Sequence, residues 1–141
     1  MNKSIINWDN LFDQKDSFHN SKPFKFAFVE NIFNNNFYEK LYQTYPKIDD
    51  SWIPFSNFTK SQLGKQWGNS DDIVNSDGVD TTFSKEWNEF KLYTESEEFL
   101  SNIRKFTGTT VNRSKLFQFM SYKKGGFQMP HIHNVGPNTV I

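Results

Sequence analysis

The segment that most constrains the fold is Tyr122–Ile141, which reads YKKGGFQMPHIHNVGPNTVI. Side chains alternate in character over residues 116–123, and this period-2 pattern predicts a strand that ends at Gly125-Gly126. A second strand is expected to begin near Phe127 and Pro130. The chain should therefore form a sheet here, with two histidines on its second strand.

The two histidines are His131 and His133, and they stand one residue apart. Side chains at i and i+2 of a strand point to the same face, so both rings are expected to aim at one point. Two converging imidazoles suit Fe, Zn, Cu or Ni, but a protein metal site normally needs at least three ligands. His19, Glu97 and Glu98 lie far upstream, and no third ligand is evident. The spacing alone supports a metal site and a pair of surface histidines equally.

The balance of charge argues against polyanionic partners. Sixteen basic and sixteen acidic residues give a net charge of zero. Proteins that bind nucleic acids or anionic membranes usually carry an excess of basic residues. No apolar run is long enough to span a bilayer, and the N-terminus has no secretory h-region. Cysteine is absent, which excludes disulfides and thiolate chemistry. We expect a cytoplasmic protein without a nucleic-acid or membrane partner.

The 141 residues are enough for a single domain, which we expect to span residues 1–141 with an arm at 1–22 and a core at 23–141. The arm is expected to be extended or a short helix. Alternation of Phe24, Phe26 and Phe28 with other residues predicts a strand. A helix should follow, capped within residues 34–36 and ending before Pro46.

Residues 46–82 hold many Gly, Pro and polar residues, and we expect loops with short strands there. Helical patterns return at Ser84. Thr94 and Glu97 fit a capping box that would start a further helix, and Gly108 is a good stop for it. The buried stripe of this last helix is expected to be Phe99, Leu100, Ile103 and Phe106.

With the histidines placed after Y-x-x-G, the chain resembles the N-terminal half of a 2-oxoglutarate- and Fe(II)-dependent oxygenase of the prolyl-hydroxylase-like branch. The strand FKFAFVENIF, the helix NFYEKLYQTYP and the strand LFQFMSY fit loosely. The segment YKKGGFQMPHIHN, Tyr122–Asn134, fits most closely. The resemblance implies an α+β fold, a double-stranded β-helix of the jelly-roll or cupin-like kind, with N-terminal helices packed on the sheet.

The resemblance also implies roles for individual residues. His131 matches the first iron-binding histidine of the family's His-x-Asp/Glu pair, and His133 stands where the carboxylate ligand normally stands. Tyr122 matches a tyrosine that contacts 2-oxoglutarate in some members. The implied function is a dioxygenase that uses Fe(II) as cofactor and 2-oxoglutarate as cosubstrate to hydroxylate a small-molecule or peptidyl substrate.

Two departures from the family pattern shape the expectation. His133 replaces the usual Asp or Glu, which makes the site more cationic. The family's distal histidine and its basic residue for 2-oxoglutarate lie downstream of the position where this sequence ends, at Ile141. We therefore expect these 141 residues to be a fragment that stops before the barrel closes, and to lack 2-oxoglutarate turnover alone.

Two other functions remain open from the sequence. A cupin-type metal-binding barrel has Gly, five residues and His-x-His, which Gly125, His131 and His133 satisfy. Its following Glu should fall at Pro137 or Asn138, so the match fails there. The second alternative is a non-catalytic binding module in which the two histidines have no role.

Overall fold

The computed structural model describes residues 5–68, 78–114 and 117–131. Over these ranges the chain has a mixed α+β structure with an open antiparallel sheet, which confirms the predicted class at this coarse level. The described chain divides into two compact units. The helical unit consists of residues 5–45 and 85–113, and the sheet unit consists of residues 46–68, 78–84, 114 and 117–131. A single domain over residues 1–141 stays a prediction.

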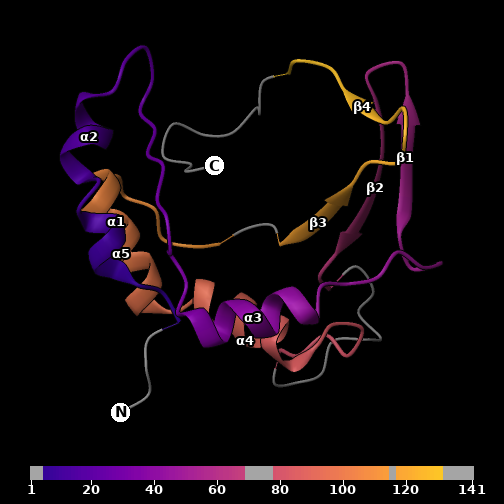
Figure 1. Ribbon diagram of the computed structural model, residues 1–141, viewed down its shortest axis with the longest axis horizontal. Helices are drawn as coiled ribbons and strands as arrows, with labels where there is room; N and C mark the ends of the chain where they lie inside the picture. The colour runs from indigo at the N-terminus through magenta and orange to yellow at the C-terminus, as the bar shows by residue number, and fades with distance from the viewer. Residues whose placement is uncertain (1–4, 69–77, 115–116, 132–141) are drawn as a thin grey trace. The chain divides into compact units, whose positions relative to one another are not determined.

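The described part of the helical unit holds five helices, coloured indigo to orange in Figure 1. They are α1 (Trp8–Phe12), α2 (Lys15–Asn20), α3 (Asn35–Gln43), α4 (Lys85–Thr94) and α5 (Glu97–Thr107). Helices α1, α2 and α4 contact α5, and α3 contacts α4. The apolar core of this unit is small and consists of Ile6, Leu11, Leu41, Leu100 and Phe106.

Aromatic rings attach the N-terminal segment to α5. The ring centroids of Trp8 and Phe99 are 5.6 Å apart, and those of Phe18 and Phe106 are 4.8 Å apart. Each such ring buries a large apolar area, so two helices of five and six residues can be held by few contacts. The predicted arm is therefore a pair of short helices that pack on α5.

Helix α3 agrees closely with its prediction, because the residues that start and end it lie within one short segment of the chain. The side chain of Asn34 accepts a hydrogen bond from the Asn36 backbone N–H at 3.1 Å, and the helix ends at Gln43. Helix α5 ends as predicted before Gly108, whose φ of 72° is the left-handed conformation that glycine favours at this position.

The predicted N-cap of α5 was wrong. Thr94 is the last residue of α4, and its hydroxyl donates to the Lys91 carbonyl at 2.7 Å. Ser96 is the N-cap instead, and its side chain accepts from the Phe99 backbone N–H at 3.2 Å. Both residues are of capping type, and the continuation of α4 to Thr94 leaves the role to Ser96.

The strand predicted from Phe24, Phe26 and Phe28 is also wrong. Residues 24–29 have no ladder partner among the described residues, and the neighbouring strand-like contact is a single bridge between Ile6 and Phe33. The three phenylalanines are 68%, 54% and 77% exposed. Alternation favours an extended backbone, but a strand forms only where a second strand pairs with it.

The sheet unit is built around one central strand. The strands are β1 (Ile53–Asn57), β2 (Lys60–Gln66), β3 (Gln118–Ser121) and β4 (Phe127–Gln128), and Figure 1 shows β2 between β1 and β3. β1 and β2 form an antiparallel hairpin in which Phe55 pairs with Gln62. β3 and β4 both pair antiparallel with β2.

A small cluster of side chains covers one face of this sheet. The ring centroids of Phe83 and Phe119 are 5.4 Å apart in a stacked arrangement, and the Lys65 ammonium lies 5.0 Å from the centre of the Phe83 ring. All three side chains are buried. The aromatic cluster of the sheet unit therefore lies on the face that carries Lys65 and Phe119.

The described ranges contain no helix with the length and apolar character needed to cross a bilayer.

Candidate functional site

A bulge between β3 and β4 creates the candidate site. In the β2 register Leu63 pairs with Ser121, and Ser61 pairs with Phe127, so residues 122–126 stand opposite Gln62 alone. The Gly125-Gly126 segment, where the predicted strand was to end, does not join two strands that pair with each other. Instead it returns the chain to the same edge of β2, as a large β-bulge does.

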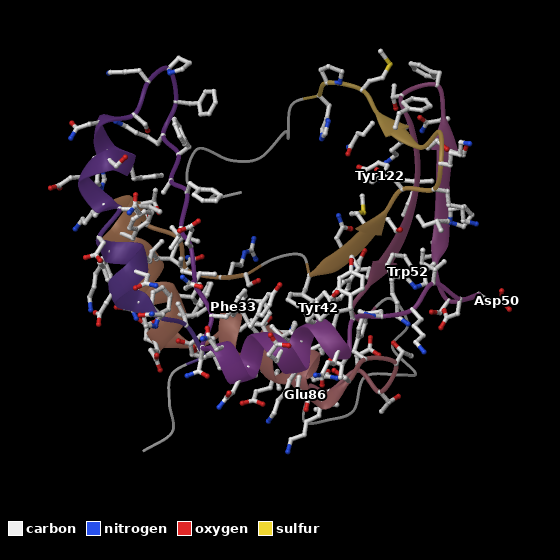
Figure 2. The ribbon with its side chains drawn as sticks, viewed as in Figure 1. Phe33, Tyr42, Asp50, Trp52, Glu86 and Tyr122 are labelled. Atoms are coloured by element: carbon white, nitrogen blue, oxygen red, sulfur yellow. The ribbon has the colours of Figure 1, made fainter. Side chains whose placement is uncertain are left out.

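The bulge brings two polar side chains together. Tyr122 continues the alternation of Gln118 and Met120, and Gln128 pairs with Lys60 on the same face of the sheet. The Tyr122 hydroxyl donates to Gln128 Oε1 at 2.9 Å, across six positions of the chain. Figure 2 labels Tyr122 at this place. The bulge thus directs the phenol toward the segment that carries His131.

His131 completes a chain of hydrogen bonds. Gln128 Nε2 lies 3.2 Å from His131 Nε2, and His131 Nδ1 lies 3.1 Å from the Met129 carbonyl oxygen. Because Gln128 Oε1 accepts from Tyr122, the amide nitrogen is the group that faces the ring and donates to Nε2. Nε2 is then the accepting nitrogen, and the ring proton sits on Nδ1 and is donated to Met129.

This tautomer is the one that suits a metal ligand. Metal-binding histidines commonly donate one ring N–H to a carbonyl or carboxylate, which fixes the ring and leaves the lone pair of the other nitrogen for the ion. In His131 the Met129 carbonyl performs the first task, and the lone pair of Nε2 accepts the hydrogen bond from Gln128 that an ion would have to replace. The imidazole is exposed. The geometry fits one ligand of an iron or zinc site.

The described residues do not supply a full ligand set. No three His, Cys, Asp or Glu side chains within residues 5–68, 78–114 and 117–131 gather closely enough to hold a metal ion. His133 lies outside the described residues, so the predicted convergence of the two histidines stays a prediction. His131 itself follows β4, which ends at Gln128, and does not lie within a strand.

The face that carries Tyr122 also offers an apolar surface, which we name the Tyr122 face. The Phe55 ring lies directly over Gly64, where a Cβ would be only 2.7 Å from a ring carbon. Ile53 and Phe55 are partly exposed. The strand register places on this face Ile53, Phe55, Asn57, Lys60, Gln62, Gly64, Gln66, Gln118, Met120 and Gln128, together with Tyr122. The Lys60 ammonium lies 4.9 Å from the centre of the Phe55 ring, so the face is apolar only in part.

A buried amide lies under this face. Gln62 is 5% exposed, and its Nε2 lies 3.9 Å from the Met120 sulfur. Its Oε1 has no hydrogen-bond partner in the described part of the chain. A buried acceptor without a hydrogen bond lowers stability, so Gln62 is an unfavourable polar group among the apolar members of this face.

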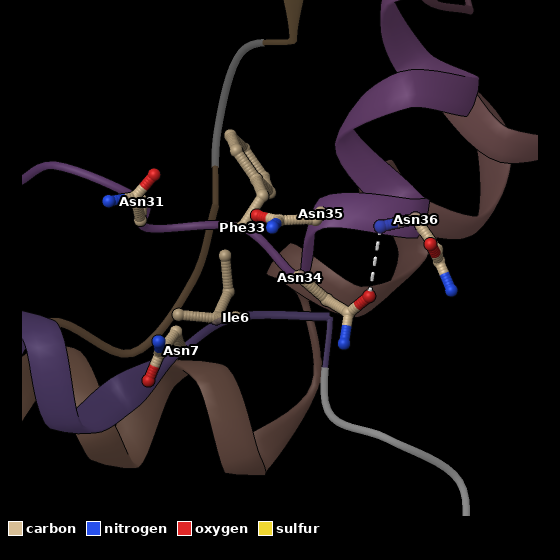
Figure 3. Close-up of a pocket in the computed structure, with 7 residues that line it drawn as sticks. All are labelled: Ile6, Asn7, Asn31, Phe33, Asn34, Asn35 and Asn36. Carbon is tan, nitrogen blue, oxygen red and sulfur yellow. Dashed lines mark hydrogen bonds between the residues drawn. The ribbon is translucent and has the colours of Figure 1, made fainter.

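An open pocket of about 680 Å³ lies where the chain enters α3. Ile6, Asn7, Asn31 and residues 33–36 line it, and Figure 3 shows these side chains. The five asparagine amides point in different directions and do not converge on one point (Figure 3). Asn34 is already used as the cap of α3. The pocket therefore lacks the convergent polar groups of a binding site.

Tyr122 and His131 were predicted as site residues from the sequence, and Gln128, which is hydrogen-bonded to both, was not. A signal was present, since Gln128 stands between the glycine pair and His131, and an amide can both accept and donate. Its role depends on the length of the bulge, which brings residues 122 and 128 side by side. No local pattern in the sequence specifies a bulge of that length.

Comparison with known protein families, with characterised proteins and with solved structures gives no match to this chain.

Proposed function

We propose that this chain belongs to a 2-oxoglutarate- and Fe(II)-dependent dioxygenase, with His131 and His133 as iron ligands and Tyr122 as a contact for 2-oxoglutarate. The observation that carries the proposal is the hydrogen bonding of His131, whose Nδ1–H is held by the Met129 carbonyl and whose Nε2 carries the lone pair. The fold that accompanies the proposal is a double-stranded β-helix, in which the four-stranded sheet would form part of one wall.

The position of Tyr122 supports the second part of the proposal. Its hydroxyl is separated from His131 by a single side chain, Gln128. A cosubstrate bound to the same ion as His131 would therefore lie within reach of this phenol. A phenolic O–H can donate to a carboxylate, and a hydrogen bond to a charged acceptor is among the stronger ones.

The bound iron and 2-oxoglutarate would supply the oxidising chemistry, in which oxygen hydroxylates a C–H bond of the substrate and 2-oxoglutarate becomes succinate and carbon dioxide. The chain's own residues would bind and orient. His131 would hold the ion through Nε2, and the Tyr122 hydroxyl would donate a hydrogen bond to the cosubstrate. Phe55 and Met120 lie on the same face of the sheet as Tyr122.

Succinate formation by the full-length protein tests this function. We expect turnover that needs both Fe(II) and 2-oxoglutarate and that is lost in His131→Ala. Tyr122→Phe should raise the concentration of 2-oxoglutarate needed by about ten- to a hundred-fold, since a hydrogen bond to a charged group contributes roughly 1.5–3 kcal/mol.

The matched control is His19→Ala, because the His19 ring bonds to the Phe106 carbonyl within the helical unit and its loss should leave turnover unchanged. Metal binding without any dependence on 2-oxoglutarate would contradict the dioxygenase and favour a cupin-type barrel. Absence of metal binding altogether would favour a non-catalytic module.

A further inference from the structure

We propose that residues 21–29, here named the phenylalanine loop, bind the surface of an anionic membrane, with Phe24 and Phe26 as the main lipid contacts. The proposal goes beyond the proposed function and does not depend on the metal site. The rings of Phe24, Phe26 and Phe28 are all largely exposed, and they follow one another at every second position. A cluster of exposed, large apolar side chains is typical of a surface that binds a protein or a membrane.

Hydrogen bonds fix the backbone of the loop. The Ser21 hydroxyl accepts from the Phe26 backbone N–H at 3.0 Å, and the same hydroxyl lies 3.0 Å from the Phe24 carbonyl oxygen. The Lys25 ammonium donates to the carbonyl of His19 near the end of α2. The ring centroids of Phe24 and Phe26 are 6.0 Å apart. The loop therefore presents the two rings together, and binding requires little further ordering of the chain.

The charge of the loop favours an anionic membrane over a protein partner. No Asp or Glu occurs between Ser17 and Val29, and Lys22 and Lys25 stand on either side of Phe24 in the sequence. The zero net charge of the whole chain therefore does not describe this loop. Lysine is depleted in protein–protein interfaces, whereas a lysine near an anionic leaflet strengthens membrane binding. Exposed phenylalanines beside lysines thus fit lipid better than they fit a protein.

Acidic side chains near one end of the loop indicate which end meets the membrane. Asp13 and Glu30 line a pocket together with Phe28. An anionic surface repels these carboxylates, so the Phe28 end should stay farther from the lipid than the end that carries the lysines. Phe24 and Phe26 should therefore bury more of their surface in the lipid than Phe28 does.

Sedimentation of the purified protein with lipid vesicles tests the apolar part of the proposal. We expect the protein to bind vesicles of phosphatidylcholine mixed with phosphatidylserine, and to bind vesicles of phosphatidylcholine alone more weakly. Phe24→Ser should weaken binding to the mixed vesicles about tenfold, because a large apolar contact is lost, and Phe28→Ser should weaken it less. Phe58→Ser is the matched control, since Phe58 is also largely exposed but lies in the turn between β1 and β2 of the sheet unit.

A charge variant tests the electrostatic part. Lys22→Gln should weaken binding to the mixed vesicles about fivefold, the usual contribution of one lysine near an anionic surface, and should not change binding to phosphatidylcholine alone. Lys22 is preferred to Lys25, because Lys25 also bonds to the His19 carbonyl and its loss would disturb the loop. Lys47→Gln, at an exposed position of the sheet unit, is the control and should bind as wild type does.

The contrary outcomes are distinct. Failure to bind either kind of vesicle overturns the proposal, and so does equal binding by Phe24→Ser, Phe58→Ser and wild type. Unchanged binding of Lys22→Gln to the mixed vesicles overturns the assignment of an anionic surface. A dimer in sedimentation velocity that Phe24→Ser dissociates, without vesicle binding, would mean that the loop joins two copies of the chain instead. No metal ion is present in these measurements, so the proposed dioxygenase stands or fails separately.

Discussion

Among single residues, the buried carboxylate of Asp80 has a structural role, because it holds the loop that leads to Phe83. Asp80 is fully buried, and its two oxygens accept hydrogen bonds from the Gly68 N–H at 2.8 Å and from the backbone and hydroxyl of Thr82 at 2.9 and 2.7 Å. Phe83 in turn stacks on Phe119 of β3. The sequence does not single out Asp80, because an Asp in a polar, glycine-rich stretch is usually a solvated turn residue.

Replacing Asp80 should therefore weaken the sheet unit. Asp80→Ala removes an acceptor that serves several donors, and we expect a loss of about 2–4 kcal/mol in the free energy of unfolding measured in urea. Asp80→Asn keeps one acceptor oxygen and should cost less. Asp50→Ala, at an exposed position, is the control and should stay within about 0.5 kcal/mol of wild type. An equally small effect for Asp80→Ala would show that other contacts hold the loop.

The Asp49 carboxyl lies on the surface, and its contribution to stability depends on pH. Hydrogen bonds from the Ser51 hydroxyl and from the Ser51 backbone N–H, the latter at 2.9 Å, hold the pKa of the Asp49 carboxyl below its ordinary value. A lowered folded-state pKa contributes stability that is present above the unfolded pKa and is lost as the pH falls through the folded pKa. The contribution of Asp49 should therefore disappear only in acid, below about pH 4.

Ser51→Ala tests this cause directly. The variant removes the hydroxyl, which has the largest effect, so the pKa of Asp49 should rise toward its ordinary value in an NMR titration of the carboxyl carbon. Ser51→Thr keeps a hydroxyl at this position and should keep the pKa lowered. An Asp49 pKa that is the same in the alanine variant and in wild type would mean that the hydroxyl has no such effect.

Among the elements, helices were predicted better than strands, and the reason is physical. Helix α3 is specified by Asn34 at its start and by the spacing of its own apolar residues, all within one short segment. In the predicted stripe of α5, Leu100 and Phe106 are buried, and Phe99 and Ile103 are partly buried. Residues 24–29 have the alternation of a strand, but pairing needs a partner that alternation does not name.

The bulge between β3 and β4 is the element that creates the candidate site, and Gly126 makes it possible. A Cβ on Gly126 would lie 2.9 Å from the carbonyl oxygens of both Lys123 and Ser61, which are backbone atoms and cannot move aside cheaply. Gly125 has a φ of +80° but no heavy atom within 4 Å of an added Cβ. Gly126 therefore faces a steric limit, while Gly125 faces only a conformational preference.

The two glycines should thus respond differently to the same substitution. Gly125→Ala should cost about 1–2 kcal/mol in the free energy of unfolding, the penalty for a left-handed alanine. Gly126→Ala should cost more and should also separate Tyr122 from Gln128, which an NMR comparison of the Tyr122 ring signals would detect. Equal costs for the two variants, with undisturbed Tyr122 signals, would contradict the steric account.

For the molecule as a whole, the sequence was sufficient to predict the mixed α+β class but not the pairing of the strands. β2 is the centre of the sheet, yet it falls in the stretch of residues 46–82 that was expected to hold loops with short strands. Its partner β3 follows only after α4 and α5, so the contact that assembles the sheet joins distant parts of the chain. Local patterns carry no information on such a pairing, and the bulge depends on it.

The candidate site also depends both on a short sequence motif and on the pairing of distant strands. His131 and Tyr122 were predicted as site residues from a short motif, whereas the hydrogen bonds that link them through Gln128 exist only because two short strands share β2 as a partner. The proposed function depends on one property of His131, namely that its Nε2 can bind a metal ion.

Anaerobic titration with Fe(II) of wild type, His131→Ala and His19→Ala measures this property. His19 is a matched control, because its ring is tied to the Phe106 carbonyl at 2.9 Å within the helical unit. We predict that wild type and His19→Ala bind Fe(II) with equal affinity and that His131→Ala does not bind it. Unchanged Fe(II) affinity in His131→Ala would contradict the assignment of His131 as a metal ligand.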